Sequence, residues 1–348
     1  MSIKYSSVFY VLLFTILVLT GCKGKKQEVK QETKPETVQV AREPVVIGKE
    51  TTLLLKELVD AGDYVNSKEF PSLIKASIVY ESLGKNILVI DIRPASAFSA
   101  GHIKGAVNKK FEELPGYFES GIKPFEYDKI IMVCEDGQAS CYTTSLLRLM
   151  GYGNVYSMRW GMSAWKNSCA MDAWFRGVSG KYETSLEKIV NEKPLPKGMP
   201  ELGTGMGTGA EIADARFLSL FKEGTSEILV SADDVFKESS KYFIINLERK
   251  DKYEDGHIPG AVRYKPEETL GFTEEMASIP TDKTIIVYCG TGHNSGFATA
   301  YLRLFGYDAR TLRYGNNGFM YNKMVSQRLA LSWLPFSSED VNDFPVVK

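Results

Sequence analysis

The sequence predicts an α/β protein in which one folding unit occurs twice, each with a central, mainly parallel sheet flanked by helices. The segment Gly-His-Ile-Lys-Gly-Ala-Val at 101–107 has a counterpart at 256–262. The segments 131–134 and 147–152 recur at the same spacing, as 286–289 and 302–307. In both copies, short apolar runs rich in β-branched residues alternate with helical patterns, which is typical of buried parallel strands joined by helices. An internal repeat of this length therefore indicates two domains of one kind.

Each predicted element is defined by a local pattern. The strands are short apolar runs bounded by polar residues, at 86–90, 130–133 and 154–156 and again at 242–245, 284–288 and 309–312. Helices are predicted over 143–150 and 298–305, each ended by a glycine at 151 or 306. Ser231, with Asp234 three residues later, resembles a helix-capping box. We expect the first domain at 60–178, a Pro- and Gly-rich linker at 179–214, and the second domain at 215–340.

Composition excludes several classes of protein. The chain has 348 residues, 44% of them hydrophobic, so it has enough apolar material for sizeable cores and is not wholly disordered. The 42 Lys and Arg residues balance 43 Asp and Glu residues, which leaves no overall basic field for nucleic acid. Five Cys and three His, with no Cys-x-x-Cys pair, exclude a disulfide scaffold and give no reason to expect a metal or another cofactor.

The first 21 residues are predicted to be an export signal. Lys4 precedes an apolar run from Val8 to Leu19, which is shorter than the roughly 20 residues that a membrane-spanning helix needs. Leu19-Thr20-Gly21-Cys22 resembles a bacterial lipobox, which implies cleavage before Cys22 and lipid attachment to that residue. An uncleaved membrane anchor that merely contains a cysteine is the alternative. We expect residues 22–59 to form the lipid anchor and a polar tether to a bilayer of the cell envelope, on its periplasmic or outer side.

One cysteine in each copy is placed where chemistry is expected. Cys134 and Cys289 each follow a predicted buried strand and precede a short glycine-containing loop and a helix. Ligands of open α/β sheets bind at that edge, and loop amides together with a helix N-terminus favour an anionic sulfur. This matters because only about 3% of an ordinary cysteine, with a pKa near 8.5, is thiolate at pH 7.

The order of motifs resembles the tandem rhodanese, or sulfurtransferase, family. The first copy contains Asp91-Ile92-Arg93-Pro94, the Gly-His-Ile segment, Cys134 with Gly137, and Gly161-Met162-Ser163-Ala164-Trp165. The second copy has Asn246 and Glu248 in place of Asp91 and Arg93, and Tyr253 in place of Phe98. Its loop has Cys289 with Gly292. The resemblance implies two rhodanese-like domains and an enzyme whose cysteine takes a sulfane sulfur from a small donor of the thiosulfate or 3-mercaptopyruvate type. The resulting persulfide would pass its sulfur to a thiol or other nucleophile, on a small molecule or a protein.

The resemblance also assigns roles to single residues. Both loop cysteines are candidate nucleophiles, and we favour Cys289, because Glu135 and Asp136 should raise the pKa of Cys134 whereas His293 can donate to Cys289 or carry partial positive charge. The expected substrate-binding loops are Gly290, Thr291, Gly292, His293, Asn294 and Ser295, and Glu135, Asp136, Gly137, Gln138, Ala139 and Ser140. Asp91, Arg93, His102 and His257 are expected to support the fold near the site.

One departure from the family keeps alternatives open. Many single-domain members carry an arginine at the loop positions that Ala139 and Asn294 occupy, so neither loop supplies a permanent cation for an anionic donor. A non-catalytic module that binds a partner protein or a small anion therefore competes with the enzyme. A phosphatase or arsenate reductase is disfavoured by the same missing arginine. The sequence leaves open whether Cys141 and Cys169 form a disulfide or are small buried residues.

Overall fold

The computed structural model describes residues 45–265, 270, 275–327 and 333–348. The predicted signal peptide, Cys22 and the tether as far as residue 44 lie outside these residues. Within them, no helix is both long enough and apolar enough to span a lipid bilayer.

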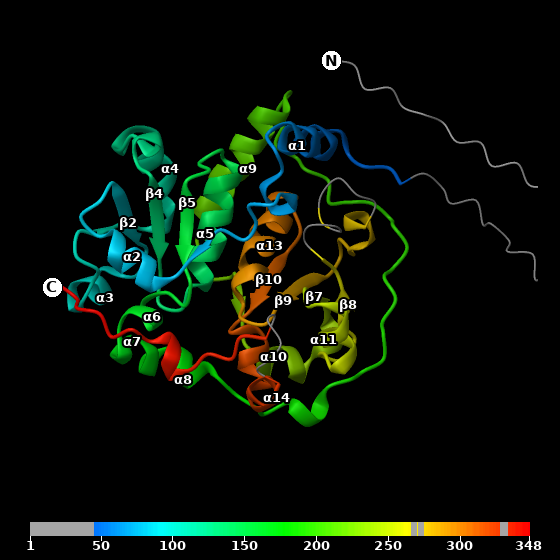
Figure 1. Cartoon of the computed structure of the whole chain (residues 1–348). Helices are drawn as coiled ribbons and strands as arrows, with labels where there is room; N and C mark the ends of the chain where they lie inside the picture. The colour runs from blue at the N-terminus through cyan, green and yellow to red at the C-terminus, as the bar shows by residue number, and fades with distance from the viewer. Residues whose placement is uncertain (1–44, 266–269, 271–274, 328–332) are drawn as a thin grey trace, which may run out of the picture. The chain divides into compact units, whose positions relative to one another are not determined.

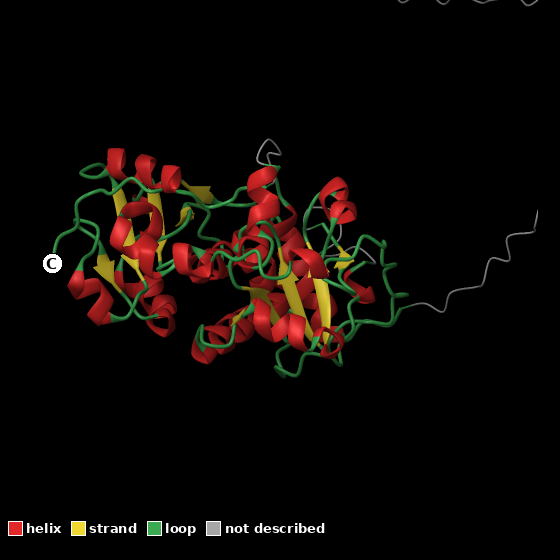
Figure 2. Cartoon of the chain, turned by 90° about the horizontal axis from the view of Figure 1, so that it is seen from below, coloured by secondary structure: helices red, strands yellow, loops and turns green. Residues whose placement is uncertain are grey.

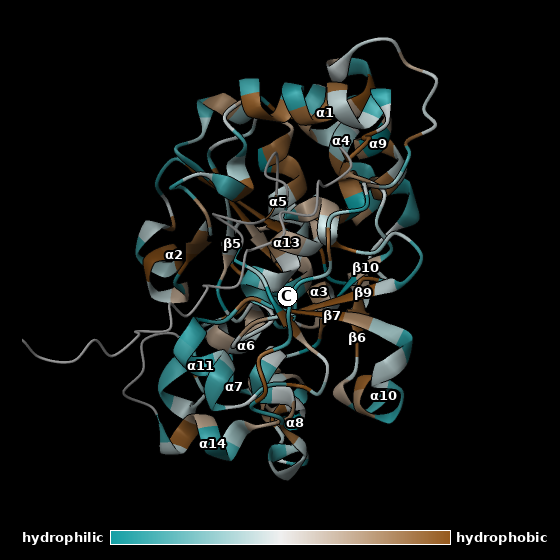
Figure 3. Cartoon of the chain, turned by 90° about the vertical axis from the view of Figure 1, so that its right-hand side faces the viewer, coloured by the Kyte–Doolittle hydropathy of each residue, from teal (hydrophilic) through white to brown (hydrophobic). Residues whose placement is uncertain are grey.

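Two five-stranded parallel sheets with the same strand order form the two units, which confirms the predicted fold class (Figure 1). In the first unit the order is β1-β5-β4-β2-β3, and in the second it is β6-β10-β9-β7-β8. The first sheet comprises β1 (Leu73–Ile74), β2 (Ile87–Asp91), β3 (Val107–Asn108), β4 (Lys129–Val133) and β5 (Val155–Met158). The second comprises β6 (Leu229–Val230), β7 (Tyr242–Asn246), β8 (Val262–Arg263), β9 (Thr284–Tyr288) and β10 (Ala309–Leu312). The apolar central strands β7 and β9 contrast with the polar outer helix α11 (Lys250–Asp255) (Figure 3).

Helices surround both sheets (Figure 2). Those of the first unit and its flanks are α1 (Lys49–Asp60), α2 (Ala76–Ser82), α3 (Ala95–Ala100), α4 (Leu114–Gly116), α5 (Gln138–Leu149), α6 (Met162–Trp165), α7 (Asn167–Asp172) and α8 (Trp174–Gly177). The second unit adds α9 (Gly209–Glu223), α10 (Ala232–Lys237), α13 (His293–Leu304) and α14 (Tyr321–Ser326). The predicted cap of α10 is present, since the Asp234 amide donates to the Ser231 hydroxyl at 3.1 Å.

The helices α5 and α13 begin five residues before their predicted starts at 143 and 298. Their first turns are largely polar, so the helical pattern was not visible there. The structure buries these turns, because α5 and α13 pack against each other between the two sheets (Figure 1). The Ser145 hydroxyl donates to the Phe297 carbonyl at 3.0 Å, and Gly296 lies where an added Cβ would be 3.2 Å from Cys141 Cβ.

Each unit is also tied to the other by the chain segment that follows it. After the first unit, Glu187 forms an antiparallel bridge with His257 of the second. After the second unit, the C-terminal segment returns to the first unit (Figure 1). There Val347 bridges to His102, and Phe344 stacks on Tyr80 with ring centroids 4.1 Å apart. The predicted domain limits of 60–178 and 215–340 miss these crossings, because local patterns do not reveal which sheet a segment contacts.

Two further boundaries differ from those predicted. The tether was expected to continue to residue 59, but α1 begins at Lys49 and buries Leu54, Leu55 and Leu58. The linker was expected to end at 214, but α9 begins at Gly209, capped by the Thr208 hydroxyl, which accepts the Glu211 amide at 3.3 Å. The two helices pack together closely, since a Cβ on Gly209 would lie 2.6 Å from the Leu53 carbonyl oxygen.

The interface between α5 and α13 predicts that the two units unfold together. Phe297 is fully buried there and contacts the rings of Tyr64 and Phe70, with centroids 6.1 and 5.6 Å away. Phe297→Ala should lower the free energy of unfolding by about 3–5 kcal/mol. In urea, tryptophan fluorescence and far-UV circular dichroism should still report one coincident transition. Two separate transitions would show that the units are energetically independent.

Candidate active site

Each loop cysteine lies at the carboxyl end of a central strand, with its loop leading into a buried helix. Cys134 follows β4 and Cys289 follows β9, and the helices start after Gly137 and Gly292, whose φ angles are 87° and 78°. Glycine is needed at these positions because side chains rarely adopt this conformation. The two loops are therefore built alike, as the repeat predicts.

Backbone amides surround the sulfur of Cys134. The amides of Gly137 and Ser140 donate to its Sγ at 3.2 and 3.3 Å. For Cys289, the amides of Ser295 and Thr291 act in the same sense and lower the pKa, and the Ser295 hydroxyl lies 3.7 Å from Sγ. Both loops thus provide the anion-binding amides that the sequence predicts.

Burial nevertheless keeps both thiols protonated at neutral pH. Burial, followed by the charges of Asp136 and Glu135, raises the pKa of Cys134 to about 12. The pKa of Cys289 is also raised, first by burial and then by Glu248. The loop amides lower the pKa of both thiols, as expected, but desolvation of the charged form outweighs these hydrogen bonds.

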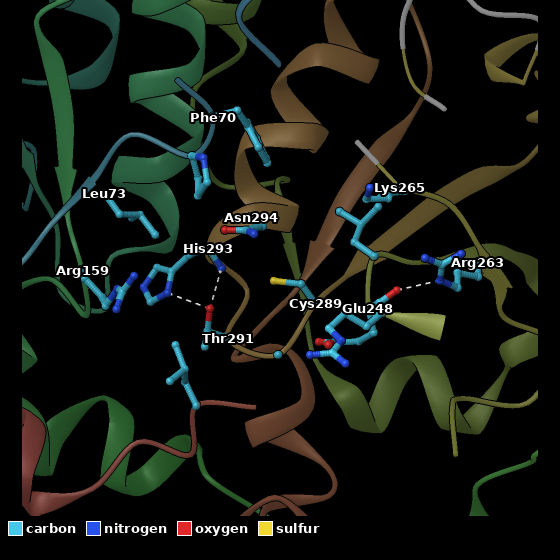
Figure 4. A pocket seen from close by; sticks show the side chains of 15 residues that line it. Phe70, Leu73, Arg159, Glu248, Arg263, Lys265, Cys289, Thr291, His293 and Asn294 are labelled. Atoms are coloured by element: carbon cyan, nitrogen blue, oxygen red, sulfur yellow. Dashed lines mark hydrogen bonds between the residues drawn. The ribbon is translucent and has the colours of Figure 1, made fainter. Parts of the chain in front are cut away.

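The two cysteines differ in access to solvent and ligand. Cys134 is 2% exposed, whereas Cys289 is 6% exposed and lines an open cavity of about 320 Å³ (Figure 4). The cavity lies between the units and is lined by Phe70, Pro71, Leu73, Arg159, Leu247, Glu248, Arg249, Arg263, Lys265, Cys289, Gly290, Thr291, His293, Asn294 and Leu334. The sulfur of Cys289 points into this space (Figure 4).

Four basic side chains line this cavity, although the loop itself has none. They are Arg159 from the first unit and Arg249, Arg263 and Lys265 from the second. Arg263 is held in place by a bond from its Nε to the Glu248 carbonyl at 2.8 Å, and Arg249 pairs with Asp251 at 3.0 Å. These four residues lie outside the two Cys loops and were not predicted from the sequence. Comparison of the repeats could have found Arg263 and Lys265, which follow the Gly-His-Ile segment where the first unit has Asn108 and Lys110.

Two arginines at equivalent positions of the repeat each extend to the other unit, where they meet different surroundings. Arg159 precedes Trp160-Gly161, and Arg313 holds the same position before Tyr314-Gly315. Arg159 enters the Cys289 cavity, whereas Arg313 pairs with Asp136 of the Cys134 loop at 3.5 Å. The positive charge that reaches the Cys134 loop is therefore balanced by a carboxylate beside that thiol.

His293 joins the two loops as a neutral residue. Burial, with a smaller contribution from Arg159, lowers its pKa to about 3. Its Nδ1 lies 2.8 Å from the Thr291 hydroxyl, and its Nε2 lies 3.2 Å from the Asp136 carbonyl oxygen and 3.3 Å from the Trp160 amide nitrogen. The expectation that His293 carries partial positive charge was wrong, although the residue does line the Cys289 cavity.

Gln138 is the counterpart of His293 in the first loop, and it also crosses to the other unit. Its Oε1 accepts the Tyr314 amide at 2.6 Å. Glu135 lines a separate cavity of about 390 Å³ that also contains Arg93 and Cys169. Asp136 and Ser140 are buried, so the Cys134 loop mainly contacts protein.

The four residues expected to support the fold near the site make local contacts in the two units. The Arg93 guanidinium and the Asp91 carboxylate form a buried ion pair at 2.7 Å, and Arg93 also donates to the Gly101 carbonyl at 2.9 Å. The imidazoles of His102 and His257 stack on Phe98 and Tyr253. In each case the Nδ1 atom lies within hydrogen-bond distance of the carbonyl oxygen of the stacked residue.

A protein-family model described as "Rhodanese-like domain" matches residues 76–168 and 231–321, which together are more than half of the chain. The chain belongs to the rhodanese-like domain family. Both matches include a Cys loop, so the two sites described above are the loop sites of two rhodanese-like domains.

Individual relatives either match over about 100 residues of this chain or match over more of it at low sequence identity. A thiosulfate sulfurtransferase, GlpE, from Shewanella oneidensis is 31% identical over 102 residues, which are 29% of this chain and 97% of that protein. A tRNA uridine(34) hydroxylase from Rickettsia canadensis is 31% identical over 104 residues, so the chain spans only 39% of that protein's length. A solved thiosulfate sulfurtransferase from Pseudomonas aeruginosa is 14% identical, with a TM-score of 0.27, covering 81% of this chain and 49% of that one.

Cys141 and Cys169 are both free thiols in this rhodanese-like chain. Cys141 is fully buried, with its Sγ 3.3 Å from the Ser157 hydroxyl oxygen, while Cys169 is partly exposed. Of the two possibilities that the sequence left open, the structure shows the unpaired one. Among the residues described, no cluster of His, Cys, Asp and Glu is arranged to hold a metal ion.

The accessibility of the two loop thiols predicts a difference in alkylation. In the folded protein, iodoacetamide should modify Cys289 faster than Cys134 by roughly tenfold or more, because Cys134 requires local opening. Peptide mass spectrometry after increasing reaction times measures both rates, with a urea-unfolded sample as the control in which they converge. Equal rates in the folded protein would contradict the assignment of Cys289 as the accessible thiol.

Proposed function

We propose that the protein is a sulfurtransferase that carries sulfane sulfur on Cys289 as a persulfide. The observation that supports this most directly is a loop cysteine that opens into a cavity with four basic side chains. The relationship to a curated thiosulfate sulfurtransferase is consistent with this activity. We propose a small anionic sulfur donor, of the thiosulfate or 3-mercaptopyruvate type, and a thiol or other nucleophile as acceptor.

The geometry suggests how the transfer proceeds. Arg159, Arg263 and Lys265 attract the anionic donor, and a unit charge at about 4 Å contributes several kcal/mol when partly desolvated. Cys289 loses its proton and its sulfur attacks the outer sulfur of the donor. The bond between that sulfur and the rest of the donor breaks, and the electron pair leaves with the donor remnant. The amides of Thr291 and Ser295 then stabilise the anionic persulfide until an acceptor thiolate attacks its outer sulfur.

The first unit has a supporting role in this proposal. Its Cys134 is covered by protein and adjoins Asp136 and Glu135, which disfavour a thiolate. It contributes Phe70 and Leu73 to the wall of the Cys289 cavity, and Arg159 to the binding of the anionic donor. The alternative of a non-catalytic module fits this unit better than the second, because its thiol is covered by protein.

Substitution of each loop cysteine tests the proposal. Cys289→Ser should abolish sulfur transfer, lowering turnover by about 10³-fold or more, because the nucleophile is lost. Cys134→Ser should retain most activity. Sulfide or thiocyanate release is measured with thiosulfate and with 3-mercaptopyruvate, and intact-mass spectrometry detects the added sulfur. If an added sulfur appears only on Cys134, the assignment is wrong; if the anion binds but neither thiol gains sulfur, the protein is a binding module.

We also propose that the mature chain is anchored through lipid on Cys22, since Leu19-Thr20-Gly21-Cys22 resembles a lipobox. A residue with several acyl chains is a stable anchor, whereas one chain binds only reversibly. In bacterial cells that express the full chain, wild-type protein should enter the detergent phase, and Cys22→Ser should move to the aqueous phase. Detergent-phase partitioning followed by immunoblotting measures this. Unchanged partitioning of Cys22→Ser would favour the uncleaved anchor.

A further inference from the structure

Glu248 is an acidic side chain in the wall of the Cys289 cavity, at a position where the first unit has an arginine. It is 5% exposed and lies two residues after the end of β7, as Arg93 lies two residues after the end of β2. In the first unit, Asp91 pairs with the arginine, but the corresponding residue in the second unit is Asn246, which carries no charge. The second unit therefore has no equivalent of this ion pair, and it has a buried carboxyl in the cavity that its thiol lines.

Glu248 does not replace the structural contact that Arg93 makes. Arg93 donates to the Gly101 carbonyl and so holds the Gly-His-Ile turn of the first unit. In the second unit, Tyr288 holds that turn, because its hydroxyl accepts the Ile258 amide at 3.2 Å. The position of Tyr288 is occupied by Val133 in the first unit, which has no hydroxyl. The structural role has moved to Tyr288, and the carboxyl of Glu248 is available for another one.

The surroundings of Glu248 raise the pKa of its carboxyl above the usual range. One carboxyl oxygen lies 3.2 Å from Asn316 Nδ2, and the Gly290 amide of the Cys289 loop also donates to the carboxyl. The charged groups that act on it are Lys252 and Arg249, which favour the carboxylate, and Asp251, which opposes it. Among the described residues, no basic side chain forms an ion pair with Glu248. Burial dominates these influences and raises the pKa of Glu248 to about 8.

We propose that Glu248 is a catalytic acid–base group that exchanges a proton with Cys289 and with the leaving group of the sulfur donor. This inference rests on the proposed sulfurtransferase function. It requires a buried carboxyl and the thiol in one cavity, and Glu248 and Cys289 both line this cavity. The charge of Glu248 raises the pKa of Cys289, and the Glu248 carboxyl accepts a hydrogen bond from the amide of Gly290, the residue that follows Cys289.

The proton balance selects a class of donor. The Glu248 carboxylate takes the Cys289 proton, and the thiolate attacks the donor sulfur. For a mercapto-carbonyl donor, the C–S bond breaks, its electron pair forms an enolate, and the Glu248 carboxyl protonates the carbon, leaving a persulfide and the reduced carbonyl compound. An alkyl persulfide donor likewise loses an alkyl thiolate that takes this proton. Sulfite leaving from thiosulfate needs no such proton. Donors with a basic leaving group therefore gain most from Glu248.

Two donors compared in one variant test the inference. In Glu248→Gln, kcat/KM for 3-mercaptopyruvate should fall by about 100-fold, within the range of a general acid–base contribution, because the base for Cys289 and the acid for the leaving carbon are both lost. The fall for thiosulfate should be smaller, because its sulfite leaving group needs no proton and only the base for Cys289 is lost. A small alkyl persulfide is a third donor and should follow 3-mercaptopyruvate. Glu254→Gln, which removes an exposed carboxyl from α11, is the matched control and should leave all three rates unchanged. Glu248→Asp should recover part of the lost rate.

The pH dependence separates a chemical role from a structural one. The active form of the enzyme has one proton shared between Cys289 and Glu248. Below about pH 8 both groups are protonated, so the enzyme is inactive. The rate therefore rises as pH rises through about 8. In Glu248→Gln this limb should move to the higher pH at which Cys289 itself ionises. A limb that stays in place, or an equal loss of rate with every donor, would overturn the inference. If the wild type transfers sulfur from no donor, the proposed function fails instead.

Stability gives a readout that does not depend on activity. Between about pH 4.5 and pH 8 the unfolded chain has lost the Glu248 proton while the folded chain keeps it, so folding stability falls as pH rises through this range. Glu248→Gln should lack this contribution, and its Tm should therefore rise relative to the wild type as pH increases. A Tm difference that is constant from pH 5 to pH 9 would show that Glu248 is an ordinary ionised carboxylate, and the inference would fail.

Discussion

The packing of α5 against α13 holds the two units together and sets the position of both Cys loops. These helices start directly after the two Cys loops, so their contact fixes both loops at one interface. The contact is made by small and polar residues, such as Ser145 and Gly296, that let the helices approach closely. Because the loops meet there, each unit contributes side chains to the surroundings of the other unit's cysteine.

The contacts across this interface come in equivalent pairs whose chemistry has diverged. Gln138 and His293 each reach the other unit and lie next to a backbone amide, of Tyr314 or Trp160. Arg159 and Arg313 also cross, but one enters a cavity and the other meets Asp136. The duplicated frame is therefore preserved by hydrogen bonds, while its charges differ between the two sites. That difference leaves one thiol covered and the other beside an open, basic cavity.

Burial sets the chemical problem at the open site. A thiol surrounded by protein is a poor nucleophile until it loses its proton, and two or more loop amides do not compensate for desolvation. An anionic donor brings further negative charge, which the surrounding basic side chains can balance. The proton must still have somewhere to go. A buried carboxyl in the same cavity answers this requirement in a way that a permanently charged carboxylate would not.

The repeat, the order of strands and helices along the chain, the two Cys loops and the resemblance to a family could all be predicted from the sequence. These follow from local patterns: apolar runs such as 284–288, and loop glycines such as Gly292. Three features became visible only in the folded chain: which thiol is accessible, that Arg159 lines the cavity of the other unit's cysteine, and that His293 is neutral. Burial and contacts between distant segments depend on how the two units pack, and no local pattern records that packing.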